Sequence, residues 1–152
     1  MKWTLVSTKS RQEIYELRNA EEKLLTLIFH ADSGSVRITA DNEKRVFLVG
    51  REGLLRSRTV LRNEYGIRMA QLNYENAYDS MGTIDFDNEK FAYSVQKHFF
   101  SELTIYKNGE SLVTCELPPV HMESYQQDQD FLILTLCWYV FSIVKKDAEE
   151  YA

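Results

Sequence analysis

Apolar and polar residues alternate along most of the chain. From about residue 2 to about residue 117, apolar side chains mostly alternate with polar ones, as at Leu25, Leu27 and Phe29 and again at Ile84 and Phe86. A period of two is typical of strands that bury one face and leave the other in water. The pattern therefore predicts about eleven antiparallel strands.

Short clusters of Asn, Asp and Gly separate these runs. Such residues tolerate the left-handed backbone of tight hairpins, and Asn108-Gly109 is the strongest of these signals. Many short strands at this spacing are expected in a sandwich or a barrel.

The turn sequences also repeat. Asn19, Asn63 and Asn108 each follow an apolar and a basic residue, and they lie 44 and 45 residues apart. Residues 17–49 align in this way with residues 61–95, which predicts a repeating four-strand unit. Chance reuse of the same hairpin chemistry is the alternative. Three such units would close a barrel, and closure removes exposed sheet edges.

The end of the chain has a different pattern. Two prolines and a polar stretch precede a continuous apolar run over residues 131–144, which Lys145 and Lys146 follow. Acidic residues before the run favour a helix N-terminus, and the lysines favour a C-terminus. We therefore predict a helix over about residues 130–146. Because it is apolar on every side, other atoms must surround it.

Such a segment can be surrounded by the rest of the protein, as a buried helix, or by lipid, as a membrane tail anchor. Its 14 apolar positions span roughly 21 Å, which is short of the roughly 30 Å hydrocarbon core of a bilayer. A barrel of about a dozen strands also has an interior too wide for its own side chains to fill. We predict a mostly β protein, a closed antiparallel barrel of about 11–12 strands around a buried apolar C-terminal helix, as one domain over residues 1–152 without a transmembrane span.

Composition narrows the class of protein. The 152 residues suit one domain, and the six glycines and two prolines argue against a disordered or fibrous chain. A net charge of −5 disfavours a nucleic-acid partner. Cys115 and Cys137 have no metal-ligand spacing, so we interpret them as small buried apolar residues. Free thiols and a start without a signal-peptide pattern favour the cytoplasm.

The whole pattern resembles the tubby C-terminal-like superfamily, which comprises tubby domains, phospholipid scramblases and LURP-one-related proteins. The resemblance rests on the hairpin at 17–25, its echo at 61–69, the Gly-Thr-Ile-Asp-Phe run at 82–86 and the terminal segment at 131–144. It implies a twelve-stranded barrel around an apolar helix, and a function in binding membranes or partners. The single-domain LURP-one-related form is the most similar. No residues match tubby's basic phosphoinositide site, so that site is not carried over.

An arginine stripe is the main candidate site. Strand alternation puts Arg56, Arg58 and Arg62 on one face, Arg68 can join from the next strand, and Arg51 is close in sequence. Guanidinium groups suit phosphate and carboxylate oxygens. The alternative is a solvated outer face whose arginines pair with nearby Glu and Asp.

Two weaker candidates carry no assignment. The acidic segment Asp85, Asp87, Asn88 and Glu89 lacks the Gly and Glu of a calcium loop and is interpreted as a turn, so no metal site is predicted. His121, Glu123 and Cys115 match no nucleophile or zinc pattern. We therefore predict no catalytic residue and no cofactor.

The sequence as a whole favours a non-enzymatic binding or scaffold module. It would engage an anionic phospholipid or a protein partner through the arginine-rich barrel face, in the cytoplasm and peripherally at a membrane. The lipid part of this hypothesis comes from the resemblance. A structural protein-interaction domain without lipid affinity is the alternative, and a tail-anchored protein or an enzyme agrees less well with the pattern.

Overall fold

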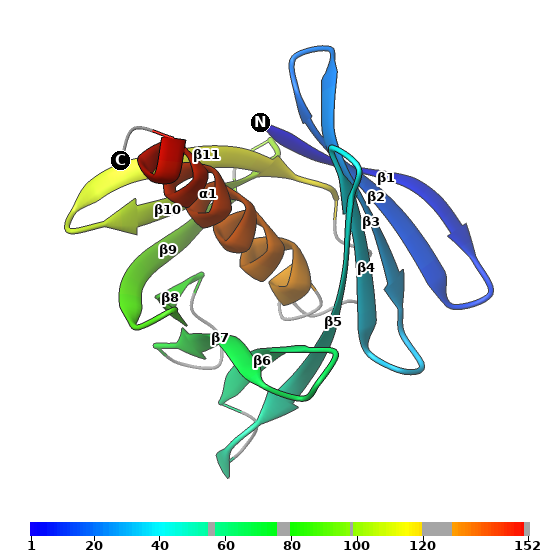
Figure 1. Ribbon diagram of the computed structural model, residues 1–152, viewed down its shortest axis with the longest axis horizontal. Coiled ribbons are helices and arrows are strands. Elements are labelled where there is room, and N and C mark those ends of the chain that lie inside the picture. The colour runs from blue at the N-terminus through cyan, green and yellow to red at the C-terminus, as the bar shows by residue number, and fades with distance from the viewer. Residues whose placement is uncertain (55–56, 76–79, 98, 120–128, 151–152) are drawn as a thin grey trace.

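The structure is a computed structural model that describes residues 1–54, 57–75, 80–97, 99–119 and 129–150, with side chains up to residue 142 in the last range. Its eleven strands form one closed barrel around a helix, α1 (Asp130–Glu150) (Figure 1). The strands are β1 (Lys2–Lys9), β2 (Gln12–Asn19), β3 (Glu22–His30), β4 (Ser35–Ala40), β5 (Glu43–Glu52), β6 (Arg58–Asn63), β7 (Arg68–Tyr74), β8 (Met81–Phe86), β9 (Glu89–Lys97), β10 (Ser101–Lys107) and β11 (Glu110–Leu117). The predicted fold class is confirmed.

The barrel closes at a narrow seam. Every strand is antiparallel to the one before it, but β1 and β11 run parallel. An odd number of alternating strands requires one such parallel junction. Here Lys2 is in register with Glu116, whose backbone N–H donates to the Met1 carbonyl at 3.0 Å.

The hairpin turns have the backbone that their sequences predict. Asp41 and Asn42 both have positive φ (44° and 67°), and so do Asp87 and Asn88 (50° and 63°). Two successive positive φ values suit the twist of two-residue hairpins, and Asn and Asp tolerate them well. Asp87 and Asn88 of the acidic segment therefore form a turn, as predicted, and Asp85 and Glu89 belong to the flanking strands β8 and β9.

The sequence repeat corresponds to a repeat of hairpins. The register shifts by one residue in β2–β3, β6–β7 and β10–β11, at Leu17/Arg18, Leu61/Arg62 and Ile105/Tyr106.

Successive turns alternate between the two ends of such a barrel. The turns that follow β2, β4, β6, β8 and β10 therefore share one end. Each of them contains an asparagine or directly follows one (Asn19, Asn42, Asn63, Asn88 and Asn108), so we call it the asparagine end.

The helix forms the centre of the hydrophobic core. All side chains from Phe131 to Trp138 are buried. The Phe131 ring stacks on Phe29 with centroids 4.3 Å apart, and Trp138 meets Phe47 edge-on at 5.4 Å. The predicted burial of the apolar helix is thus confirmed over its first two turns.

Two details of the predicted helix were wrong. The helix continues to Glu150 instead of ending near residue 146, and Tyr139 to Ser142 are only half-buried. A six-residue strand tilted by about 40° rises only ~15 Å, and the helix from Asp130 to Trp138 rises about 13 Å. The helix therefore outgrows the barrel. It leaves by the asparagine end, where partial burial, with the charges of Asp41 and Glu22, raises the pKa of Tyr139.

Candidate functional site

The predicted stripe lies on the outer surface of β6. Leu61 belongs to the core and Thr59 contacts the helix, so both point into the barrel. Arg58 and Arg62 consequently point outward, as strand alternation predicts. Arg56, the first residue of the stripe, lies outside the described residues.

The β6–β7 hairpin brings a third arginine to this surface. Arg68 is the register partner of Arg62 across the hairpin. Its side chain is exposed, and its Nη1 donates to Gln71 Oε1 at 2.6 Å. We call Arg58, Arg62 and Arg68 the arginine face. That this face binds a ligand stays a prediction.

Arg51, which the sequence places nearby, points elsewhere. It lies in register with the inward-facing Thr59. Its guanidinium carbon is 5.7 Å from the centroid of the Tyr74 ring, a cation–π geometry. Arg51 is exposed and therefore lies at the mouth of the barrel at the end opposite the asparagine end.

One carboxylate lies among the three arginines. Arg62 Nη2 donates to Glu52 Oε1 at 2.8 Å, and Arg62 Nη1 donates to the Gly66 carbonyl at 3.2 Å. The hydrogen bond from Arg62, with the charges of Arg62, Arg58 and Arg68, lowers the pKa of Glu52. The face therefore keeps an excess of two positive charges, three arginines against one glutamate.

Two of the three arginines remain available to an incoming anion. Among the described residues, no carboxylate forms an ion pair with Arg58 or Arg68. Arg58 Nε itself is buried and has no hydrogen-bond partner among these residues, so this atom is out of reach of an incoming anion. Arg62, by contrast, is held by Glu52 and by the backbone of the β6–β7 turn.

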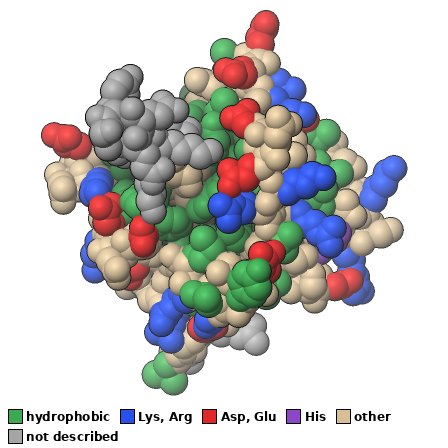
Figure 2. Space-filling view, in the orientation of Figure 1, with side chains coloured by type: hydrophobic (Ala, Val, Ile, Leu, Met, Phe, Trp, Pro, Cys, Tyr) green, Lys and Arg blue, Asp and Glu red, His purple; other side chains and the backbone are tan. Residues whose placement is uncertain are grey.

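Exposed apolar side chains flank the arginine face at both ends. Leu54, in the turn before β6, is 87% exposed. Tyr65 and Ile67, in the turn after β6, are 80% and 62% exposed. In the lower part of Figure 2, Lys and Arg side chains lie between hydrophobic side chains over this part of the barrel. Sequence reasoning missed these residues, although large apolar residues at predicted turns can be recognised in the sequence as candidate contact residues.

A buried polar cluster anchors the start of the helix. Thr59 Oγ1 donates to Asp130 Oδ2 at 2.7 Å, and the Tyr74 hydroxyl donates to the same oxygen. Burial, with the charge of Asp130, raises the pKa of Tyr74. The sequence could not reveal this cluster, because its members are 56 and 71 residues apart.

The other sequence candidates do not assemble into a site. His121 and Glu123 lie outside the described residues. Cys115 and Cys137 are buried, and desolvation raises the pKa of each thiol to about 12. Such thiols are poor nucleophiles at neutral pH. In the described part of the chain, no group of three or more His, Cys, Asp or Glu is placed to hold a metal ion.

Comparison with protein-family models, with curated proteins and with solved structures finds no match to this chain. The resemblance to the tubby C-terminal-like superfamily therefore stays a prediction. Among the described residues, no helix has the length and apolar character to cross a bilayer.

Proposed function

We propose that the chain is a non-enzymatic binding module that docks on an anionic phospholipid surface through its arginine face. The observation that carries the proposal is the gathering of three guanidinium groups around a single carboxylate, Glu52. Basic side chains close to an anionic bilayer contribute about 1 kcal/mol each. In a chain of net charge −5, this surface would also orient the molecule as it approaches.

The flanking apolar side chains favour a lipid surface over a free anion. Leu54 precedes the face, and Tyr65 and Ile67 follow it, all exposed to solvent. Apolar side chains beside basic ones gain free energy when they enter the boundary between headgroups and acyl chains. A small soluble anion bound to the arginines would not bury these apolar side chains.

Co-sedimentation with vesicles tests the proposal. The vesicles contain phosphatidylcholine alone or with phosphatidylserine, at low and high salt. We expect salt-sensitive binding to the anionic vesicles only, because added salt screens surface charges. The variant Arg58→Gln/Arg68→Gln should weaken this binding by about tenfold or more. Arg62 is left in place because it also holds the β6–β7 turn.

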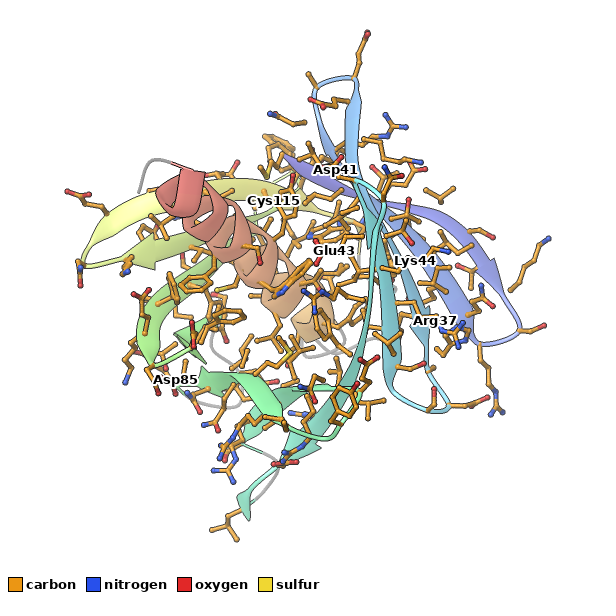
Figure 3. The ribbon with its side chains drawn as sticks, in the orientation of Figure 1. Arg37, Asp41, Glu43, Lys44, Asp85 and Cys115 are labelled. Carbon is orange, nitrogen blue, oxygen red and sulfur yellow. The ribbon has the colours of Figure 1, made fainter. Side chains whose placement is uncertain are left out.

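A matched control changes the same number of charges elsewhere. Arg37 on β4 and Lys44 on β5 are exposed and lie on the side of the barrel away from Asp85 and β8 (Figure 3). Arg37→Gln/Lys44→Gln should bind anionic vesicles nearly as the unmodified protein does. Equal losses in both variants would contradict a specific arginine face. If the folded protein does not bind anionic vesicles, the proposal of a lipid partner is wrong. A protein partner is then the hypothesis to test.

A further inference from the structure

A cavity of about 930 Å³ opens at the asparagine end, between the helix and the barrel wall. Ala70, Phe86, Trp138 and Phe141 line it with apolar atoms. Figure 2 shows hydrophobic side chains in the middle of this face and charged side chains around them. Its volume falls within the roughly 300–1,000 Å³ typical of small-molecule sites, and barrel mouths are a common place for such sites.

The cavity exists because the interior of the barrel is wider than the helix that it encloses. A helix with its side chains is about 10–12 Å wide, and a barrel of eleven strands encloses more space than that. The helix packs on the β3 and β5 side through Phe29 and Phe47. Towards β8 and β9 the contact comes from Phe141, which meets Phe86 at 4.8 Å and Phe91 at 6.4 Å. The space beside these rings stays open.

Four carboxylates and three basic side chains line the opening, and among the described residues Glu43 and Glu89 form ion pairs whereas Asp85 and Asp87 form none. Arg45 donates to Glu43 at 2.8 Å, and Lys107 donates to Glu89 at 2.7 Å. Asp85 accepts a hydrogen bond from Asn73 and lies opposite Lys90 in the β8–β9 register. Glu43 and Asp85 mark two sides of the opening in Figure 3.

Arg68 connects this cavity to the arginine face. It lines the opening, and it is also the register partner of Arg62. Its Nη1 donates to the neutral side chain of Gln71, so its charge is not cancelled there. An apolar floor beside an uncompensated guanidinium is complementary to a molecule with a hydrocarbon chain and an anionic head.

We propose that the cavity binds a single-chain amphiphile, with its chain along Phe86, Trp138 and Phe141 and its carboxylate or phosphate head at Arg68. A fatty acid and a lysophospholipid share this chemistry. The inference rests on the proposed function only through Arg68, which both sites use. It adds a bound lipid molecule to a protein that otherwise docks on a lipid surface.

Titration of the full chain with saturated fatty acids, below the concentration at which they aggregate, tests the cavity. The readout is tryptophan fluorescence, and Trp138→Phe separates Trp138 from Trp3 in the core. Each buried methylene strengthens binding, so two more methylenes should tighten it by about tenfold until the cavity is full. A second titration series with lysophosphatidic acids of increasing chain length tests whether a phosphate head group binds. Chain-length-dependent binding in either series supports the proposal, and its absence from both overturns it.

Two bulky substitutions on the helix provide the matched comparison. Ser142 lines the cavity, so Ser142→Phe should fill it and weaken amphiphile binding by about tenfold or more. Val140 is a half-buried neighbour outside the lining, and Val140→Phe should bind as the unmodified protein does. Thermal unfolding verifies that both variants fold. Unchanged affinity in a folded Ser142→Phe variant would contradict the proposed site.

The two proposals fail in different experiments. Arg58 belongs to the arginine face but not to the cavity lining. Arg58→Gln should therefore weaken vesicle binding and leave amphiphile affinity unchanged, whereas Ser142→Phe should do the reverse. Loss of amphiphile binding in Arg58→Gln would contradict a separate cavity site.

Discussion

At the scale of single residues, Thr135 places a polar group without a hydrogen-bond partner among the described residues in the core. Its side chain is fully buried within the helix, and its hydroxyl has no hydrogen-bond partner among the described residues. A buried hydroxyl without a partner loses its hydration and gains nothing in return. The Nε1 atom of Trp3, on β1, is likewise buried without a hydrogen-bond partner among the described residues.

Thr135→Val should stabilise the protein. Valine has nearly the same shape as threonine and carries no hydroxyl, so the free energy of unfolding should rise by about 1 kcal/mol. The melting temperature should rise by roughly 2–4 °C in a domain of this size. Urea unfolding measures the change, and Thr135→Ser, which keeps the hydroxyl and loses a methyl group, should be less stable than the unmodified protein. A less stable valine variant would show that the hydroxyl has a partner.

Glu52 limits the charge of the arginine face. Glu52→Gln removes the one carboxylate among the arginines and should tighten binding to anionic vesicles by about fivefold. Because Arg62 lowers the pKa of Glu52, this carboxylate stays ionised to a lower pH when the protein is folded. The difference between the variant and the unmodified protein should therefore persist at neutral pH and disappear as the pH falls through that lowered pKa. Weaker binding by the variant would mean that Glu52 positions Arg62 for the lipid.

At the scale of secondary-structure elements, the start of the helix is tied to two strands. Asp130 accepts hydrogen bonds from Thr59 on β6 and Tyr74 on β7, and the two hydroxyl oxygens lie 2.9 Å apart. The helix thus enters the core in one position relative to the β6–β7 hairpin. That same hairpin carries the arginine face on its outer side.

Removing either hydroxyl should loosen this attachment. Tyr74→Phe and Thr59→Val should each lower the free energy of unfolding by about 1–3 kcal/mol, because each leaves Asp130 with one donor fewer. The raised pKa of Tyr74 keeps its hydroxyl protonated, so the effect should be constant across neutral pH. The double variant, measured in urea with both single variants, should depart from additivity because the two hydroxyls share one acceptor. Strict additivity would contradict a shared site.

Sequence reasoning reached the elements but not the contacts between distant ones. Strand alternation located the core face of β6 and so predicted where Arg58 and Arg62 point. Lys145 and Lys146 predict a helix C-terminus near residue 146, but the helix continues to Glu150. Residues 147–150 (Asp-Ala-Glu-Glu) contain neither Gly nor Pro, so nothing stops the helix there. The Asp130 cluster and the cavity depend on how the barrel wall meets the helix, which no local pattern encodes.

At the scale of the whole molecule, the proposals fix an orientation. Leu54 and Ile67 lie in the turns at opposite ends of β6, with Arg58 and Arg62 between them. A flat surface that touches both turns must run along β6, so the barrel would lie on its side. The opening of the cavity at Arg68 would then lie at the edge of the contact.

Serine substitutions at the two turns test this orientation. Leu54→Ser and Ile67→Ser should each weaken binding to anionic vesicles by about tenfold, because each removes an apolar side chain that leaves water. The salt dependence should not change, since no charge is altered, whereas Arg58→Gln/Arg68→Gln should reduce it. Val6→Ser, at a 53% exposed apolar position on β1, is the control and should have little effect. If Leu54→Ser alone weakened binding, the barrel would stand on the end that carries the β5–β6 turn. In that case Arg58 would touch the membrane, and Arg68, at the far end of the hairpin, would be too distant to contribute.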